Sequence, residues 1–403
     1  MSESRPLTFL CVSGYFKGTA LLEELKRLGC TVYLITKEKL KDEPWPREAI
    51  DEIFLIPDTT KRPDIIYAVS YLARSRQIDR ILPLDDYDVE IVAALREHLR
   101  VPGMGETTVR YFRDKLAMRV QARDKNIRVP EFVPVINYDN LREFMARVPP
   151  PWVLKPRSEA GAMGIKKLNH SEELWRRLDV LGDQQSFFVL EQFVPGDVFH
   201  VDSIIWEREI VFTIASQYGR PPMNVSHEGG VFITRTLPRA SAEAQALFEL
   251  NGKVMAALNM LRGVTHAEYI RAHADGQFYF LETAARVGGA NIAEMVEGAS
   301  GLNLWREWAR LEAAQARGET YRLPETKDHS AGVMQCLSKQ EHPDLSGYND
   351  PEVIFRAVQK YHAGLALASP DPARVQALLD EYARRFSQDF LAVMPALDKP
   401  EDH

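Results

Sequence analysis

Cysteine is scarce in this sequence, and the few cysteines present are not placed for cross-linking. Cys11, Cys30 and Cys336 are far apart, and none belongs to a C-x-x-C pair. This distribution argues against a disulfide framework and against a zinc site. It is typical of small buried side chains in a reducing compartment.

Long apolar runs and blocks of positive charge are missing as well. No segment approaches the roughly 18 consecutive apolar residues of a membrane-spanning helix. The apolar stretch after the N-terminal MSESRP is too short for a signal peptide. The net charge is −7 and no long run of basic residues is present, so the sequence carries no electrostatic footprint for nucleic acid. We therefore expect a cytoplasmic protein that binds neither nucleic acid nor membranes.

What is present is the composition of an ordinary globular protein. Of the 403 residues, 45% are hydrophobic and 27% are charged, and a chain of this length can form two or three domains. The first part of the chain alternates between apolar segments of strand length and amphipathic segments of helix length, which predicts an α/β domain with a doubly wound parallel sheet. The predicted strands are 7–12, 31–35, 53–56 and 80–84, and the predicted helices are 18–28, 63–76 and 87–99.

Further along the chain the pattern changes from α/β to α+β. A helix is predicted at 107–125, and between 187 and 281 strands outnumber helices, which favours an antiparallel sheet. Another helix follows residue 302 and ends near residue 318. The tail is a further α+β segment that closes with an amphipathic helix at 372–390.

Lys155 ends a short apolar strand and is followed by a loop of small residues that includes Ser158, Gly161 and Gly164. Such a loop can bring backbone N–H groups close to phosphate while the lysine supplies a fixed positive charge. A lysine in this setting is more often a solvated edge residue, so the pattern is weak when taken alone. A triphosphate needs a second cation. Lys115, on the preceding predicted helix, is the candidate, although most helix lysines are surface charges.

The next candidate site is a segment at the end of an apolar strand, which contains Glu191, Gln192, Phe193 and Val194. The edge of a purine needs neutral hydrogen-bonding groups and its faces need apolar packing, and a hinge segment of this kind offers both. A strand end followed by a turn is the simpler interpretation. The segment therefore indicates a purine site only when it is considered together with the other candidates, in their order along the chain.

Two glutamates lie in neighbouring strand-like segments joined by Asp275 and Gly276, a strong hairpin signal. A two-residue loop would place Glu268 and Glu282 on opposite sides of the sheet. A three-residue loop that starts at Ala274 and has Gly276 left-handed places them directly across from each other, where like charges are destabilising unless a cation lies between them. Carboxylate ligands favour Mg²⁺ or Mn²⁺. The alternative is a pair of solvated glutamates at strand ends.

An arginine and two glycines follow the second glutamate. Arg286 precedes Gly288, Gly289 and Asn291, and a helix is predicted from residue 292. Glycines before a helix N-terminus allow backbone N–H groups to approach an anion, and the arginine adds a fork of donors for phosphate or carboxylate. Beside a carboxylate pair, this segment indicates an anionic substrate close to a metal.

Taken in their order along the chain, the two lysines, the hinge segment, the glutamate hairpin and Arg286 resemble the ATP-grasp superfamily, in the branch that contains biotin carboxylase and the carboxylate–amine ligases. The resemblance covers most of the chain. It implies a pre-grasp domain at 1–105, a small ATP-grasp lobe with a linker helix at 106–195, a large lobe at 196–318 and a C-terminal α+β extension at 319–403.

The resemblance also implies roles for the candidate residues. ATP would lie between two α+β lobes, with Lys115 and Lys155 on its phosphates, the loop 158–164 closing over them and the backbone of 191–194 meeting adenine. A carboxylate would attack the γ-phosphate to give ADP and an acyl phosphate, which an amine then resolves. Positioning and charge neutralisation, to which Lys155 and Arg286 contribute, would supply the catalysis.

Two positions depart from the family pattern. Members commonly have an acidic residue for the ribose hydroxyls shortly after the hinge glutamate, and here that position is Val198, so Asp197 or His200 would have to replace it. The hairpin glutamates would hold Mg²⁺, but the usual Glu-x-Asn-x-Arg pattern has Ala284 in place of the asparagine. Mg²⁺ readily retains waters, so the loss of one amide ligand can be tolerated.

The leading hypothesis is an ATP-dependent ligase that joins a small carboxylic acid to an amine, with an amino acid or peptide as substrate. The polar loop at 217–230 offers Tyr218, Arg220 and His227 as substrate-binding candidates, although a solvated loop fits equally well. The alternatives are a biotin-carboxylase-like enzyme, which the lack of a glycine run at 158–164 disfavours, a purine-pathway enzyme, and a nucleotide-binding protein without turnover. The resemblance also suggests a homodimer.

Overall fold

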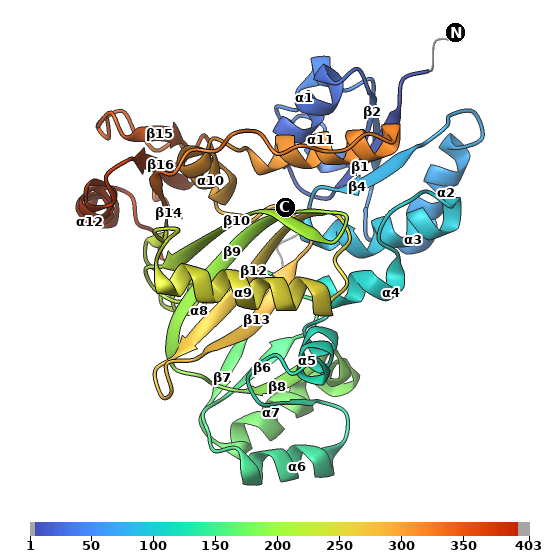
Figure 1. Cartoon of the computed structure of the whole chain (residues 1–403). Helices are drawn as coiled ribbons and strands as arrows, with labels where there is room; N and C mark the ends of the chain where they lie inside the picture. Colours follow the sequence, from blue (N-terminus) through green and yellow to red (C-terminus); the bar gives the residue numbers. More distant parts are fainter. Residues whose placement is uncertain (1–4, 394–403) are drawn as a thin grey trace.

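The computed structural model describes residues 5–393, and its N-terminal part contains the parallel sheet expected from the sequence (Figure 1). The strand order is β3-β2-β1-β4, and every neighbouring pair is parallel. The strands are β1 (Thr8–Ser13), β2 (Thr31–Lys37), β3 (Glu52–Ile56) and β4 (Arg80–Pro83).

Helices cover both faces of this sheet. They are α1 (Thr19–Arg27), α2 (Arg62–Leu72), α3 (Val89–Leu99) and, from the C-terminal half of the chain, α11 (Leu304–Arg317). Phe9 of β1 packs in the same cluster as α1 and α11, whereas its neighbour Leu10 packs with α2 and α3. Successive β1 residues therefore point to opposite buried faces, which explains the uninterrupted apolar sequence of this strand. All three cysteines are buried and free, as expected.

The helix predicted at 107–125 is interrupted by a 3₁₀ turn, so that it consists of α4 (Glu106–Val109) and α5 (Lys115–Asp124). Asp114 caps α5, because its carboxylate accepts hydrogen bonds from two backbone N–H groups of the first turn. Lys115 is therefore the first residue of a helix and not a mid-helix surface residue.

The small lobe, at the bottom of Figure 1, is an antiparallel sheet with two helices packed on it. The strand order is β5-β8-β6-β7. The elements are β5 (Phe132–Pro134), α6 (Tyr138–Arg147), β6 (Trp152–Pro156), β7 (Lys166–Leu168), α7 (Ser171–Leu181) and β8 (Phe188–Gln192). Side chains of both helices and of the strands form one apolar cluster.

An eight-stranded sheet forms the centre of the large lobe, in the order β13-β12-β9-β10-β11-β14-β16-β15. The strands are β9 (Gly196–Trp206), β10 (Glu209–Tyr218), β11 (Phe232–Thr236), β12 (Gly263–Ala272), β13 (Phe278–Ala284), β14 (Ser330–Leu337), β15 (Val353–Arg356) and β16 (His362–Ser369). The accompanying helices are α8 (Pro222–Glu228), α9 (Ala242–Ala257), α10 (Ile292–Ser300) and α12 (Pro372–Asp389). The expected C-terminal extension is thus continuous with the large lobe, since β14 pairs with β11.

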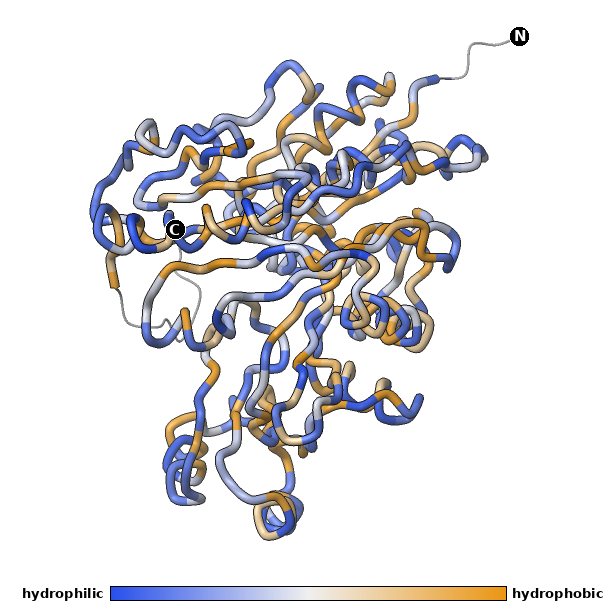
Figure 2. Tube along the Cα trace, turned by 60° about the vertical axis from the view of Figure 1, so that its left-hand side comes forward, coloured by the Kyte–Doolittle hydropathy of each residue, from blue (hydrophilic) through white to orange (hydrophobic). Residues whose placement is uncertain are grey.

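The two faces of β9 have different surroundings. Phe199 and Val201 pack in the cluster that contains α9, whereas Ile204 packs in the cluster that contains α10 and α11. The alternation of a strand places His200 and Asp202 on the Ile204 side, away from α9. In Figure 2, hydrophobic stretches run through the strands in the middle of the molecule and the outer loops are largely hydrophilic. Within residues 5–393, no helix is both long and apolar enough to cross a bilayer.

Candidate active site

A cavity of about 440 Å³ is lined by residues of both the small and the large lobe. Such a volume suits a nucleotide-sized ligand. In the small lobe the lining comes from β6, β8 and the loop between β6 and β7, and in the large lobe from α8, β12 and β13. The predicted residues that line this cavity are Lys155, Gly161, Glu191, Gln192, Phe193, Val194, Glu268 and Glu282.

Lys155 is held in place by an ion pair with a buried carboxylate. Its Nζ lies 2.8 Å from Oε2 of Glu191, and Nε of Arg119 lies 2.8 Å from Oε1 of the same residue. Burial raises the pKa of Glu191, but the positive charges of Arg119 and Lys155 lower it to about 2. Two cations against one carboxylate leave a net positive charge at this wall of the cavity, which suits a phosphate.

The carboxylate of Glu191 orients Lys155. The contact with adenine that was expected of the backbone of residues 191–194 stays a prediction, and all four residues line the cavity. The N–H of Gln192 donates to the carbonyl of Glu131 at 2.8 Å, and that of Phe193 donates to the carbonyl of Pro151 at 3.1 Å. Both N–H groups are thus engaged in bonds within the small lobe.

Arg119 was not predicted from the sequence. It is fully buried, and it also donates to the carbonyl of Leu281 in β13, which joins the small lobe to the large one. Arg119 follows Lys115 by four residues on α5, so the two side chains share a helix face. That spacing is the signal from which the sequence could have suggested it.

The loop between β6 and β7 is tied to two cations through its carbonyl groups. Nζ of Lys115 donates to the carbonyl of Glu159 at 2.5 Å, and Arg113 donates to the carbonyl of Ser158. Gly161 has a left-handed backbone with φ of 65° and lines the cavity. The loop therefore presents its glycine turn to the cavity, while the carbonyls of its first residues face away to Lys115 and Arg113.

The hairpin glutamates lie directly across from each other, as predicted, but not for the predicted reason. The turn spans four residues, 273–276, because the N–H of Ala272 donates to the carbonyl of Gln277. Pairing Glu268 with Glu282 then requires one extra residue in β13, a β-bulge at Leu281. Gly276 is left-handed with φ of 68°, as expected.

A smaller cavity adjoins the first one, and Glu282 lines both. Here Nζ of Lys115 lies 3.1 Å from Oε2 of Glu282. Nη2 of Arg286 lies 3.2 Å from Oδ2 of Asp86, and Nη1 of Arg113 lies 3.3 Å from the same oxygen. The small cavity is therefore lined by three basic side chains, Arg113, Lys115 and Arg286, and by three carboxylates, those of Asp86, Glu159 and Glu282.

Asp86 brings the N-terminal domain into this site. It follows β4, at the carboxyl end of the parallel sheet, where α/β sheets commonly bind ligands. Burial raises the pKa of Asp86, but Arg286, Arg113 and Lys115 together lower it to about 2. Asp86 was not predicted, because no local pattern connects it to an arginine 200 positions later in the chain.

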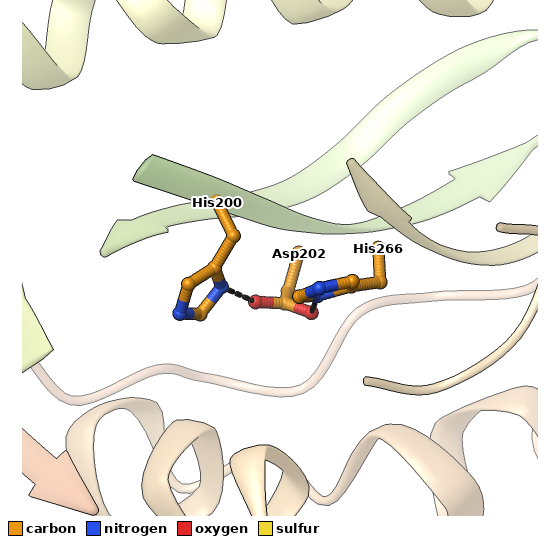
Figure 3. Close-up of side chains that lie close together, drawn as sticks. All are labelled: His200, Asp202 and His266. Atoms are coloured by element: carbon orange, nitrogen blue, oxygen red, sulfur yellow. Dashed lines mark hydrogen bonds and ion pairs between the residues drawn. The ribbon is translucent and has the colours of Figure 1, made fainter. Parts of the chain in front are cut away.

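A buried histidine–aspartate–histidine cluster lies next to Glu268 (Figure 3). Oδ2 of Asp202 lies 2.7 Å from Nδ1 of His200, and Oδ1 lies 2.9 Å from Nδ1 of His266. Burial lowers the pKa of His266, but Asp202 and Glu268 outweigh this effect and raise it to about 9. Burial lowers the pKa of His200. Burial raises the pKa of Asp202, but His266 and His200 outweigh this effect and lower it.

The ribose contacts expected of His200 and Asp197 do not fit these positions. His200 is fully buried, and its Nε2 lies 2.8 Å from Oγ1 of Thr234, so both ring nitrogens are engaged. Asp197 pairs with Arg271 at 3.3 Å and is not among the residues that line the cavity. Ser158 and Gly164, also expected to bind ATP, do not line it either.

The segment 217–230 does line the cavity, though not through the residues that were singled out. Pro221 to Ser226, mostly within the short helix α8, form the wall. Arg220 is ion-paired with Glu228, and His227 is exposed. Neither residue lines the cavity.

The remaining substrate candidates form the surroundings of the site. Tyr218 is buried, and its hydroxyl donates to Oε1 of Glu268 at 2.7 Å. A Cβ on Gly288 would lie 2.9 Å from Nδ1 of His266, so the backbone there packs closely on the histidine cluster. Asn291 is left-handed, with φ of 58°, and precedes α10. Nothing lies within 4 Å of a Cβ added at Gly289.

Two family models match the chain over most of its N-terminal three quarters. The model of the ATP-grasp N-terminal domain matches residues 22–103, and the model of the ATP-grasp domain matches residues 112–290. The chain belongs to the ATP-grasp superfamily. The resemblance inferred from the order of the lysines, the hinge and the hairpin glutamates is thereby confirmed.

Individual proteins similar to this chain include the L-arginine-specific L-amino acid ligase of Bacillus subtilis, which is 26% identical over 262 residues, 63% of this chain and 62% of that protein. An uncharacterized protein of Sinorhizobium fredii is 21% identical over 70% of this chain. The alignments span about three fifths of the length of these two relatives, 62% and 58%.

Solved structures confirm the fold over nearly the whole length. The L-amino acid ligase from Bacillus licheniformis has a TM-score of 0.77 at 18% identity and covers 97% of this chain and 99% of its own. The N5-carboxyaminoimidazole ribonucleotide synthetase from Thermus thermophilus has a TM-score of 0.72 at 16% identity and covers 96% and 99%. At this level of identity, the likeness establishes the ATP-grasp fold alone.

Proposed function

We propose that this protein is an ATP-dependent ligase that activates a small carboxylic acid as an acyl phosphate and couples it to an amine. The observation that carries the proposal is the position of Glu282. It lines both the large cavity, beside Lys155, and the small cavity that holds Arg286 and Asp86. A nucleotide in the large cavity would direct its phosphates toward Glu282, so that an acid with its carboxylate at the small cavity, whose volume is about 30 Å³, would meet the γ-phosphate.

The large cavity offers complementary surfaces for the two ends of ATP. Val153, Val198 and Leu281 supply apolar walls for a purine. Because the N–H groups of Gln192 and Phe193 are engaged elsewhere, donation to adenine would fall to the N–H of Val194. The ammonium of Lys155 would keep its contact with Glu191 and direct its remaining N–H donors to the phosphates.

The carboxylates of the site suit a divalent cation. Glu268 and Glu282 face each other on one side of the sheet and line one cavity, and paired like charges of this kind are costly without a cation between them. Both would hold Mg²⁺ or Mn²⁺ through oxygen atoms. When bound, the metal would neutralise charge on the transferring phosphoryl group.

In the proposed reaction, an oxygen of the acid forms a bond to the γ-phosphorus while the bond from that phosphorus to ADP breaks. The amine then attacks the carbonyl carbon, the bond from carbon to the phosphate oxygen breaks, and the amine proton passes to solvent. Lys115, Arg113 and Arg286 would stabilise the charge that develops on phosphate and carboxylate oxygens. No covalent bond to the protein is required.

An amino acid is the substrate class that the polar groups around the small cavity favour, although at about 30 Å³ the cavity itself admits only one end group of such a molecule. Within the described residues, Oδ1 of Asp86 and Nε of both Arg113 and Arg286 are buried without a hydrogen-bond partner. They offer one acceptor and two donors, which match an ammonium and a carboxylate group. The names of the Bacillus relatives point to the same class. A cytoplasmic location and a homodimeric assembly stay predictions from the sequence.

The proposal is tested by incubating the protein with ATP, Mg²⁺ and paired pools of amino acids, and by measuring phosphate release and new amide products by mass spectrometry. We expect release of phosphate that requires two amino acids. Glu282→Gln should abolish it, and Glu249→Gln, on the exposed face of α9, should not. ATP binding without turnover in any pool would favour a silent nucleotide-binding protein. Turnover that requires bicarbonate or a purine precursor would favour the two other enzymes considered.

A further inference from the structure

The proposed metal site has a histidine next to the place where the family pattern has its asparagine. His266 of β12 pairs directly with Ala284 of β13, two residues from the pair formed by Glu268 and Glu282. Because side chains two residues apart on a strand share a face, all four side chains point to the same side of the sheet. His266, Glu282 and Ala284 also line the small cavity together.

Because the side chain of Ala284 is short and apolar, His266 is the member of this pair that presents a polar group to the small cavity. An asparagine at 284 would lie opposite His266 on the same face of the sheet. With alanine there, the ring of His266 is the polar group that reaches the metal-binding face at this level of the hairpin. The polar group that the family pattern has at position 284 of β13 is thus replaced by His266, which lies opposite it on β12.

Hydrogen bonds on the Nδ1 side fix the orientation of the His266 ring. Its Nδ1 bonds to Oδ1 of Asp202, and Asp202 is in turn fixed by His200, whose Nε2 bonds to Thr234. The backbone of Gly288 packs on the bond between His266 and Asp202. A carboxylate on one ring nitrogen is the common way in which proteins orient a histidine that binds a metal through the other nitrogen.

The other ring nitrogen points at the carboxylate expected to bind the metal. Nε2 of His266 lies 3.7 Å from Oε1 of Glu268 and 3.4 Å from the hydroxyl of Tyr218. The distance between Nε2 and Oε1 is longer than a hydrogen bond. It is within the range expected for two ligand atoms on one ion, since bonds of about 2.0–2.2 Å place neighbouring ligands roughly 3–4 Å apart.

We propose that Nε2 of His266 is a ligand of the divalent cation, in place of the amide that Ala284 lacks, that the cation displaces the proton from Nε2 when it binds, and that Asp202 and His200 position the ring. The inference rests on the proposed function, because it assumes a cation between Glu268 and Glu282. A nitrogen ligand shifts the preference of a site from Mg²⁺ toward Mn²⁺. The protein is thus expected to bind Mn²⁺ more tightly than Mg²⁺ in the presence of nucleotide.

The direct test is pulsed electron paramagnetic resonance of Mn²⁺ bound to the full-length protein with a non-hydrolysable ATP analogue. Protein labelled with ¹⁵N only at histidine should show hyperfine coupling from one ¹⁵N nucleus. The coupling should disappear in His266→Gln and persist in His273→Gln, an exposed histidine just after β12. Asp202→Asn should keep the coupling and weaken Mn²⁺ binding about 10- to 100-fold.

A second variant distinguishes ligation from a role in folding. If His266→Gln lowers Mn²⁺ affinity, the added change Ala284→Asn should restore it at least in part, because an amide then returns to the family position. Circular dichroism would show that both variants are folded. Bound Mn²⁺ without histidine coupling would overturn the inference and leave the proposed function standing. Failure of the wild-type protein to bind Mn²⁺ with the nucleotide analogue would overturn both.

Discussion

Nζ of Lys155 lies 2.8 Å from Oε2 of Glu191, within the cavity that the two lobes share. Glu191 is 1% exposed and is also paired with the fully buried Arg119. The carboxylate thus serves two purposes: it neutralises a buried arginine and holds a lysine ready at the cavity surface. An incoming phosphate would meet a cation whose position is already fixed, which reduces the ordering required on binding.

The first prediction concerns the stability of this ion-pair cluster. Glu191→Gln leaves Arg119 buried without a counter-charge, and removing one partner from a buried pair costs about 3–5 kcal/mol. We expect a loss of this size in the free energy of unfolding measured with urea. Glu249→Gln, which removes an exposed ion pair with Lys253, should cause no measurable loss. Equal stability of the two variants would contradict the account.

The second prediction concerns acid. The folded-state pKa of Glu191 is about 2, below its usual value of 4.5. A depressed pKa means that the pairing stabilises the fold above the usual value, and that this contribution is lost as the pH falls from about 4.5 toward 2. Urea unfolding across this range should therefore show a steeper loss of stability in the wild-type protein than in Glu191→Gln. Parallel pH curves would show that the carboxylate does not carry this contribution.

The third prediction separates acid binding from nucleotide binding. Asp86 pairs with Arg286 and Arg113 at the small cavity and does not line the large one. Asp86→Asn should raise the KM for the amino acids about tenfold or more, an effect of at least 1.4 kcal/mol, and should change the KM for ATP little. The matched control is Asp42→Asn, an exposed residue of the same domain. A rise confined to the KM for ATP would contradict the assignment of the small cavity.

The fourth prediction uses two adjacent glycines as an internal control. A Cβ at Gly288 would lie 2.9 Å from Nδ1 of His266 and 3.1 Å from Oδ1 of Asp202, whereas nothing lies within 4 Å of a Cβ at Gly289. Gly288→Ala should therefore destabilise the protein by about 1–3 kcal/mol through overpacking and lower metal affinity. Gly289→Ala should leave both quantities nearly unchanged. Differential scanning calorimetry and Mn²⁺ titration measure the two effects.

The fold could be predicted in outline because its signals are local. The alternating apolar segments of the first domain gave the right elements within a few residues, since each β1 side chain is buried on one face or the other. The single helix predicted at 107–125 was wrong in detail, because Asp114 caps a separate helix that begins at Lys115. The register of Glu268 and Glu282 was correct only because a longer turn and a bulge at Leu281 compensate each other.

The candidate site was predicted less completely, for a physical reason. Lys155, Glu268 and Glu282 stand in recognisable local patterns, but the groups that position them come from distant segments. Asp86 meets Arg286 across 200 positions, and Arg119 reaches the carbonyl of Leu281 across 162. No periodicity within one element encodes such contacts. His266 could have been singled out from one feature of the sequence. It lies two residues before Glu268, so the two side chains share a face of the strand.

The most direct test of the central claim follows one oxygen atom through the reaction. A mixture of amino acids carrying ¹⁸O in both carboxylate oxygens is supplied with ATP and Mg²⁺, and the released phosphate is analysed by mass spectrometry. If an acyl phosphate forms, each phosphate carries one ¹⁸O atom, because the bond from carbon to the transferred oxygen breaks when the amine attacks. Phosphate without ¹⁸O would contradict the account, because it would show that the γ-phosphate passes to water.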